Sequence, residues 1–462
     1  MKKDTTTRRT GKSRVGRRAF LSGLATAALS LPSSVPQRAR GAAGRPGAND
    51  RLRIGVIGAG IRGKYLISNL PPEGQVVAVC DCYLPRVEDT LQAKGRFRRL
   101  LTQFRNGDAR SCRAHQNYRR MLDQEKLDAV IIATPDHHHV LAAMLALRAG
   151  LDVYVEKALS LTIAEGRKLV HAVKHSGRVC QVGSQNRSIP INQFGCELIR
   201  TGGIGRVSLI ELSDYPGPMV YDHLPTEPVP DGLDWELFCG PTSLRPHNRK
   251  LWVKDEFKID GRSWRGWDLW RSYSGHLMTN WGAHSVDMVQ LALGTDGTGP
   301  VEVWPLVDGH TGEMRFCPVA VRYESGVEVR FVFPWANKQP WEFHGEKGKM
   351  IMSRNMLRTE PADLAADAPA PIRTGPDWQG NSSDVVPHLQ NWIDCIKSRA
   401  TPNAPVEVGH RSVTICHLAN IARELRRKIR WDANTETFPG DDEANALLDR
   451  PRRKGYELPE IG

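Results

Sequence analysis

Residues 53–63 read RIGVIGAGIRG, an apolar run followed by three glycines at fixed spacing. The run at 53–57 has the composition of a short buried strand, and the residues after it favour a helix through Leu70. In Gly58-Ala59-Gly60-Ile61-Arg62-Gly63 the first glycine permits a tight turn and the second lets a phosphate approach the backbone. The third glycine lets the helix pack on the strand, so the stretch predicts a strand, a turn and a helix that bind a dinucleotide.

A second apolar run, residues 75–80, ends at Asp81. A carboxylate at this distance from the glycines, about twenty residues, accepts hydrogen bonds from the ribose hydroxyls and repels a 2′-phosphate. The sequence therefore favours NAD over NADP as the cofactor. The nearby Arg86 weakens that preference because its charge opposes the repulsion.

Strand and helix patterns alternate through the rest of this region. We expect strands at 129–133, 152–155 and 179–182, and helices at 139–148 and 163–175. This alternation is typical of a doubly wound parallel sheet. We assign residues 51–180 to an α/β Rossmann domain that binds NAD, and a doubly wound domain that binds another ligand is the alternative.

Three further segments together resemble one family. They are Ala133-Thr134-Pro135-Asp136-His137-His138-His139 after a buried strand, Glu156-Lys157 after the next, and Gly282-Ala283-His284-Ser285-Val286-Asp287 farther along. The pattern is similar to the glucose-fructose oxidoreductase and inositol dehydrogenase family, Gfo/Idh/MocA, from Arg51 to about Trp431. The resemblance implies an oxidoreductase that acts on a sugar, polyol or glycoside. It also implies a second, α+β domain with an open, mostly antiparallel sheet, of which one face covers the nicotinamide and the other joins subunits of a homo-oligomer.

The resemblance implies roles for individual residues. Lys157 matches the active-site lysine, and His284 matches the histidine that removes the hydroxyl proton as hydride leaves the adjacent carbon. An ammonium stabilises a developing alkoxide, and an imidazole with a pKa near neutrality can take the proton. The residues expected beside the cofactor are Gly58, Gly60, Ile61, Arg62, Gly63, Asp81, Thr134, Pro135, His139, Glu156, Lys157 and Gln185.

The chain departs from the family pattern near these residues. Asn280 stands four residues before His284, where the family usually has aspartate, and Ala158 replaces the usual proline after Lys157. An amide neither accepts a proton nor stabilises an imidazolium by its charge, so we expect His284 to be a weaker base here. His276 and Ser272 also differ from related exported members. These departures motivate an alternative of another class, a degenerate protein that binds NAD or a sugar without turnover.

The triplet His137-His138-His139 invites a metal interpretation because imidazole is a common ligand. Adjacent histidines on a turn diverge, and no carboxylate or cysteine spacing completes a tetrahedral site. We therefore predict no metal.

From residue 181 to 431 we expect the second domain, with strands at 207–212, 301–307, 319–323 and 328–333, and then a tail over 432–462. Residues 215–270 are rich in proline and aromatic side chains, which could wall a sugar site or pack as core. Helical spacing near 389–396 and 413–425 predicts core helices, and residues 362–376 predict a surface loop.

The 462-residue chain has a net charge of +13, and its first 43 residues, with ten bases and one acid, carry +9 of it. The body carries only +4 and lacks zinc-finger spacing or a basic-aromatic ladder, so we expect no nucleic-acid partner. Arg17-Arg18 precede a run of thirteen uncharged residues, 19–31, which is too short to span a membrane. Residues 1–43 thus resemble a twin-arginine export signal, with a cleavage site near Gly41-Ala42-Ala43. A disordered basic tail is the alternative.

Export through the twin-arginine machinery would place a folded protein in the periplasm, without stable membrane insertion. The nine cysteines are an odd number without a Cys-x-x-Cys pair, which argues against a disulfide framework. Because little free NAD is available outside the cytosol, we expect the cofactor to stay bound and to be restored in each turnover. Coupled oxidation and reduction of two sugars satisfies this. So does NAD-dependent glycoside hydrolysis, in which a ketone forms, the aglycone is eliminated, water adds and the ketone is reduced. A plain dehydrogenase that draws on diffusible NAD is a further alternative.

Overall fold

The computed structural model describes residues 51–94, 98, 101–220, 223–252, 257–259, 262–264, 266–334, 340–372 and 385–461. These residues belong to one compact unit. The predicted export signal over residues 1–43 lies outside the described residues and stays a prediction.

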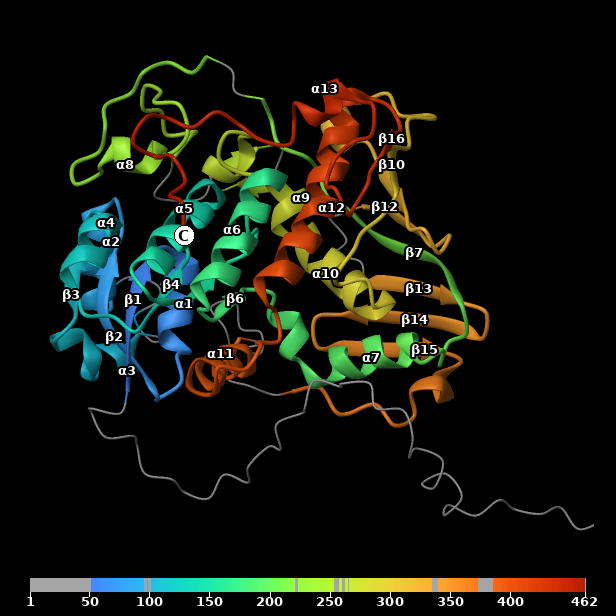
Figure 1. The fold of residues 1–462 in the computed structure, drawn as a ribbon, viewed down its shortest axis with the longest axis horizontal. Helices are drawn as coiled ribbons and strands as arrows, with labels where there is room; N and C mark the ends of the chain where they lie inside the picture. The colour runs from blue at the N-terminus through green and yellow to red at the C-terminus, as the bar shows by residue number, and fades with distance from the viewer. Residues whose placement is uncertain are drawn as a thin grey trace, which may run out of the picture. The chain divides into compact units, whose positions relative to one another are not determined.

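The first domain is built on a six-stranded sheet of order β3-β2-β1-β4-β5-β6, in which every pair is parallel. Every residue of β4 and β5 is buried because helices cover both faces of the sheet (Figure 1). The predicted Rossmann domain is therefore confirmed. Its strands are β1 (Leu52–Ile57), β2 (Gly74–Cys80), β3 (Arg113–His115), β4 (Ala129–Ile132), β5 (Asp152–Val155) and β6 (Cys180–Val182).

The helices of this domain follow the strands in the predicted alternation. One boundary was wrong: the helix expected from His139 begins at Asp136, so the three histidines form its first turn. A side-chain cap starts α6, where Thr162 Oγ1 accepts a hydrogen bond from the Glu165 amide, and Gly177 in the left-handed region ends it. The helices are α1 (Ile61–Ser68), α2 (Leu84–Leu91), α3 (Thr102–Asn106), α4 (Tyr118–Gln124), α5 (Asp136–Arg148) and α6 (Ile163–Ser176).

The second domain contains an eight-stranded sheet of order β15-β14-β13-β7-β12-β11-β10-β16. All its pairs are antiparallel except β12 with β7, which confirms the expected open, mostly antiparallel sheet. The strands are β7 (Val207–Asp214), β10 (Glu302–Pro305), β11 (Val319–Arg322), β12 (Glu328–Pro334), β13 (Trp341–Gly345), β14 (Gly348–Ser353), β15 (Met356–Glu360) and β16 (Ile429–Arg430).

One face of this sheet packs on helices. Ile210, Leu212 and Phe331 of the sheet share a core with side chains from α7 (Pro190–Arg200), α10 (Gly282–Leu293) and α12 (Val406–Leu425). The helix α12 also contacts α6 of the first domain, so it links the two sheets (Figure 1). Among the described residues, no helix is both long and apolar enough to cross a bilayer.

The last part of the chain returns to the first domain. Trp392 and Ile393 of α11 (Val386–Ser398) pack with Ile54 of β1 in one core. The residues after Trp431, predicted as a tail, include α13 (Asp442–Asn445) and lie on the fold: Arg450 pairs with Glu165 at 2.9 Å, and Tyr456 joins the core beside α5. Other short elements are α8 (Trp235–Cys239), β8 (Phe257–Ile259), β9 (Arg262–Trp264), α9 (His276–Asn280), and the 3₁₀ turns Asp108–Arg110, Gln185–Ser188, Gly266–Leu269 and Met314–Phe316. In the loop predicted at 362–376, residues Ala362–Ala365 form a 3₁₀ turn, and residues 373–376 lie outside the described residues.

The geometry of the turn between β1 and α1 explains why glycine occupies three of its positions. Gly58 has a φ of +100°, which disfavours other residues. A Cβ at Gly63 would lie 1.9 Å from the Gly58 carbonyl oxygen, so helix and strand touch there. A Cβ at Gly60 would meet nothing within 4 Å, so this glycine faces open space where a phosphate could approach.

This geometry predicts opposite effects for two similar substitutions. Gly63→Ala should lower the free energy of unfolding by ~3 kcal/mol or more because the methyl group overlaps backbone. Gly60→Ala, at an ordinary φ of −70°, should change it by less than ~1 kcal/mol. Urea denaturation of both variants measures the difference, and equal midpoints would contradict the close packing at Gly63.

Candidate active site

Asp81 lies at the end of β2, next to the glycine turn. Its Oδ2 accepts a hydrogen bond from the Ala59 amide at 2.9 Å, and its Oδ1 accepts one from the Tyr83 amide at 2.9 Å. Arg86 Nη1 is 3.7 Å from Oδ1. The carboxylate is therefore placed for a ribose, but a cation stands beside it, so the geometry does not separate NAD from NADP.

Three of the residues predicted at the cofactor come together at the start of α1. Arg62 Nε donates to Glu156 Oε1 at 2.7 Å, and Arg62 Nη2 lies 3.5 Å from Gln185 Oε1. Glu156 is buried, and the Tyr154 hydroxyl lies 3.4 Å from the same oxygen. The ion pair holds the ends of β5 and β6 against α1.

The side chains of the His137-His138-His139 triplet contact backbone carbonyl groups. The Nε2 atoms of His137 and His138 both donate to the Phe238 carbonyl, at 2.8 and 3.1 Å. The two ring nitrogens of His139 lie 2.6 and 2.9 Å from the carbonyl oxygens of Ala158 and Thr134. Since these nitrogens face carbonyls, the triplet is not arranged as a metal site. The one group of side chains in the described part that converges closely enough for a cation is Glu211, Glu342 and His344, on the second sheet.

Lys157 joins the two domains. Its Nζ donates to Asn280 Oδ1 at 2.5 Å, from the end of β5 to the end of α9. Burial lowers the pKa of Lys157 to about 8, although the charges of Glu156, Asp136 and Asp268 oppose the shift. An amine with this pKa is partly neutral near physiological pH, so it can take a proton as well as stabilise an alkoxide. The peptide bond between Lys157 and Ala158 is cis.

Two carboxylates that the sequence did not reveal lie behind Asn280. Asn280 Nδ2 donates to Asp268 Oδ2 at 3.3 Å. The Ser274 hydroxyl lies 3.2 Å from Asp268 Oδ1 and 2.8 Å from Asp136 Oδ2. Burial, and then the charge of Asp268, raises the pKa of Asp136 to about 7. Position 280 therefore lacks the carboxylate of the family pattern. The nearest one behind it is Asp268, which contacts Asn280.

His284 is the third residue of α10 and is 6% exposed. No hydrogen bond to its ring occurs among the described residues. Burial, and then the charges of Arg354 and Lys157, hold the pKa of His284 well below its usual range. The imidazole is therefore neutral near pH 7 because of burial and neighbouring cations, and the weakening that we expected from Asn280 stays a prediction.

Glycoside hydrolysis also needs a base for the C–H next to the ketone, for which the sequence offers Tyr215, Tyr221 and His276 as candidates. The structure describes two of them. The hydroxyl of Tyr215 lies 2.8 Å from Ser285 Oγ on α10, next to His284. The His276 ring donates from Nδ1 to the Asp268 carbonyl at 3.0 Å and is buried. Tyr221 lies outside the described residues.

The aromatic stretch at 215–270 packs mostly as core. Trp235, Trp252 and Trp270 are buried in one cluster with Phe238 and Tyr273. Ring stacking holds the cluster together, since Trp235 and Phe238 lie 5.0 Å apart with an interplanar angle of 16°. For these three tryptophans, core packing is the correct reading rather than a sugar wall.

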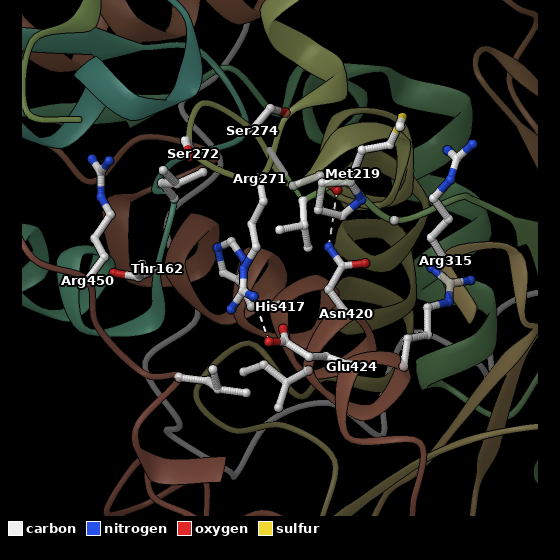
Figure 2. A pocket seen from close by; sticks show the side chains of 18 of the residues that line it. Thr162, Met219, Arg271, Ser272, Ser274, Arg315, His417, Asn420, Glu424 and Arg450 are labelled. Atoms are coloured by element: carbon white, nitrogen blue, oxygen red, sulfur yellow. Dashed lines mark hydrogen bonds and ion pairs between the residues drawn. The ribbon is translucent and has the colours of Figure 1, made fainter. Parts of the chain in front are cut away.

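A pocket of about 670 Å³ opens beside this network and is lined in part by Ser272, Ser274 and Gly275, which precede α9 (Figure 2). Arg271 extends across it to Glu424, and their ion pair measures 2.6 Å. The pocket includes neither Lys157 nor His284, so it is separate from the predicted chemistry. Its labelled lining residues are Thr162, Met219, Arg271, Ser272, Ser274, Arg315, His417, Asn420, Glu424 and Arg450.

The buried Asp136 predicts a pH dependence of stability. Its pKa is about 7 in the folded protein and near 3.8 when unfolded, so the folded state holds the proton more tightly. The stability that this provides is complete below pH 4 and is lost as the pH rises to 7. Relative to Asp136→Asn, the wild type should lose ~2–4 kcal/mol over that window in urea denaturation. The exposed Asp363→Asn serves as the control, and parallel curves for wild type and Asp136→Asn would contradict the shift.

Comparison with known proteins agrees with the two-domain fold. Residues 52–184 match the family model described as "Oxidoreductase family, NAD-binding Rossmann fold", and residues 219–458 match "Oxidoreductase family, C-terminal alpha/beta domain", both of GFO_IDH_MocA type. The chain is 30% identical over 365 residues to scyllo-inositol 2-dehydrogenase (NAD(+)) of Bacillus subtilis, which covers 76% of this chain and 88% of that protein.

Other relatives match over shorter stretches or in fold alone. The chain is 33% identical to alpha-N-acetylgalactosaminidase of Tannerella forsythia over 156 residues, about a third of each protein. The WlbA dehydrogenase of Bordetella pertussis, solved with NADH and UDP-GlcNAcA, is 18% identical with a TM-score of 0.55 over 83% of this chain and 99% of that one. The two family models span both domains, and so the chain belongs to the Gfo/Idh/MocA family of NAD-binding oxidoreductases.

Proposed function

We propose that the protein oxidises a hydroxyl of a sugar, polyol or glycoside with an NAD that stays bound through the catalytic cycle. The observation that carries the proposal is the contact of Lys157 with Asn280 at 2.5 Å, four residues before His284. It brings a buried lysine from the cofactor domain to the helix that leads into the histidine. The name of the inositol dehydrogenase relative supports a polyol or sugar as substrate.

The residues present fit a dinucleotide. The space in front of Gly60 admits a pyrophosphate at the start of α1, Asp81 would hold the ribose, and Arg62 with Glu156 would flank the cofactor. When bound, the nicotinamide supplies the acceptor for the hydride that leaves the substrate carbon.

The chain's own residues would then handle the hydroxyl proton. Lys157, with a pKa of about 8, is better matched to accept it than His284, whose pKa is held low by burial. As Lys157 gains the proton, Asn280 accepts a hydrogen bond from its ammonium, and the Asp268 carboxylate behind Asn280 stabilises the new charge. His284 would orient the hydroxyl.

The proposal predicts a separation of cofactor binding from chemistry in Lys157→Ala. The wild type, purified without added cofactor and then denatured, should release NAD or NADH near one per chain, identified by mass. Lys157→Ala should also release it but lose turnover by about 10²–10⁴-fold, the usual contribution of a positioned acid-base group. The surface variant Lys168→Ala, also in the first domain, is the control. A folded wild type that neither retains nor takes up NAD would contradict the proposal and favour a degenerate binding protein.

A second candidate is NAD-dependent glycoside hydrolysis, which returns the cofactor to its starting state. A specific observation favours it: relatives named alpha-N-acetylgalactosaminidase and glycosyl hydrolase family 109 protein match at 33% and 32% identity, over about a third of their length. This reaction needs a base for the carbon next to the ketone. Tyr215, held 2.8 Å from Ser285 beside His284, is the better placed of the described candidates, because His276 is committed to the Asp268 carbonyl.

The two reactions predict different products. If the protein is a glycosidase, aryl glycosides should be cleaved without added cofactor, and turnover in D₂O should leave deuterium on the carbon next to the oxidised one. Mass spectrometry and NMR of the released sugar measure this, with Lys157→Ala as the inactive control. Oxidised sugar without cleavage would identify the oxidoreductase instead.

We further propose that the protein is exported through the twin-arginine machinery and works in the periplasm as a homo-oligomer. The export proposal rests on the sequence of residues 1–43, with Arg17-Arg18 before the uncharged run. The oligomer proposal rests on the resemblance and on the helix-covered face of the second sheet, which leaves the opposite face for a partner subunit.

A further inference from the structure

A segment of the second domain lies across the end of the first sheet where a cofactor would bind. Residues 230–240, which include α8, follow β7 in the chain but pack on the first domain (Figure 1). We call this segment the strap. It contacts residues that follow β2, β3 and β4. In open α/β sheets the ligand occupies the crevice outside the carboxyl ends of the strands, so the strap lies at the crevice that a dinucleotide would fill.

The first half of the strap pairs with the loop that follows Asp81, the carboxylate placed for the ribose. The Asp234 amide donates to the Cys82 carbonyl at 2.9 Å, and the Leu84 amide donates to the Gly232 carbonyl at 3.1 Å. These bonds belong to a short antiparallel pairing of the two segments. Because the Asp81 carboxylate accepts a hydrogen bond from an amide of the same loop, the strap fixes the surroundings of the expected ribose.

Two further contacts hold this pairing together. Gln116, which follows β3, donates from Nε2 to the Cys82 carbonyl and to the Gly232 carbonyl, each at 3.1 Å. Gly232 has a φ of +80°, and a Cβ there would lie 2.9 Å from Cδ of Pro85. Glycine therefore lets the strap approach the start of α2 closely, and one amide side chain ties strap and loop to each other.

The second half of the strap is fastened on the other side of the crevice, at the start of α5. The Phe238 carbonyl accepts hydrogen bonds from the buried side chains of His137 and His138. A Cβ at Gly240 would lie 2.2 Å from Cε1 of His138, so the strap backbone touches this ring. In the sheet order β3-β2-β1-β4, the anchors lie beyond β2 and β3 on one side and beyond β4 on the other. The glycine turn after β1 lies between them.

We propose that the strap closes the adenosine end of the NAD site, so that the cofactor leaves only when the strap comes off the first domain. The inference deepens the proposed function and rests on it for the presence of NAD. It gives a physical reason for a cofactor that stays bound: release requires the loss of the hydrogen bonds that hold the strap as well as the cofactor's own contacts. Gln116 and Gly232 are the positioning residues of this closure.

Exchange of the bound cofactor tests the closure. The full chain is saturated with NAD and transferred to an excess of isotopically labelled NAD, and mass spectrometry of the bound fraction gives the exchange rate. Gln116→Leu removes two hydrogen bonds between strap and loop and should speed exchange by about tenfold. Gln124→Leu, at an exposed glutamine of α4, should exchange at the wild-type rate.

A pair of glycine variants separates closure from stability. Gly232→Ala should speed exchange by about tenfold or more, since its methyl group overlaps Pro85 and displaces the strap. Gly177→Ala adds the same methyl group at a φ of +62°, where nothing lies within 4 Å. It should lower the midpoint of urea denaturation because of backbone strain, and yet keep the wild-type exchange rate.

The outcomes distinguish the closure from the proposed function. Equal exchange rates in the strap variants and their controls, or a wild type that takes up no NAD, would overturn the inference. Faster exchange in the strap variants without oxidation of any sugar, polyol or glycoside would leave the inference standing and overturn the proposed function. Oxidation of a sugar by a protein whose exchange rate ignores both strap variants would do the reverse.

Discussion

A single side-chain hydrogen bond, from Lys157 Nζ to Asn280 Oδ1, joins the cofactor domain to the helix that leads into His284. A lysine buried in this way keeps its charge only if nearby groups compensate for the lost hydration. Here the compensation comes from Glu156 at its own strand end and from Asp136 and Asp268 beyond Asn280. The relative position of the two domains at the site therefore has an electrostatic cause as well as a packing cause.

The replacement of aspartate by Asn280 changes where the negative charge stands. An aspartate in direct contact would pair with Lys157 and keep it protonated to higher pH. With the amide between them, Asp268 still attracts the ammonium, but at a greater distance. This arrangement is consistent with a lysine whose pKa has fallen to about 8. In the proposed reaction, this departure from the family pattern would favour Lys157 as the proton acceptor, so it does not by itself indicate lost activity.

Much of the fold was predictable because parallel strands are buried on both faces and appear as continuous apolar runs. Residues 129–132 and 152–155 were found in this way. The strand β13 was missed because the polar residues Glu342 and His344 interrupt it in Trp341–Gly345. The start of α5 was missed because its first turn consists of Asp136 and three histidines, a polar composition that is typical of a loop. The structure shows that the Phe238 carbonyl accepts hydrogen bonds from two of these histidines, His137 and His138.

The candidate site was predictable only in part, for a reason of distance along the chain. Motifs that resemble those of the family contain Lys157, Asn280 and His284. Asp268 lies in a tryptophan-rich stretch, and it reaches Asp136 through Ser274 across 132 positions, so no local spacing reveals the pair. Similarly, helical spacing predicted that α11 is a core helix but not that its Trp392 packs against Tyr154 of β5 in the first domain.

The charged side chains of the site form two groups, cations near His284 and carboxylates beyond Asn280. The cations Lys157, Arg62 and Arg354 influence the region of His284, while the buried carboxylates Asp268 and Asp136 stand on the far side of Asn280. During oxidation a proton leaves the hydroxyl, so negative charge develops on the substrate oxygen and positive charge on the acceptor. In the proposed reaction, the charges of Arg62 and Arg354 would favour the negative charge on the substrate oxygen, and the Asp268 carboxylate behind Asn280 would favour the positive charge on Lys157. These charges are in place before the reaction, which is where fixed charges lower a barrier most.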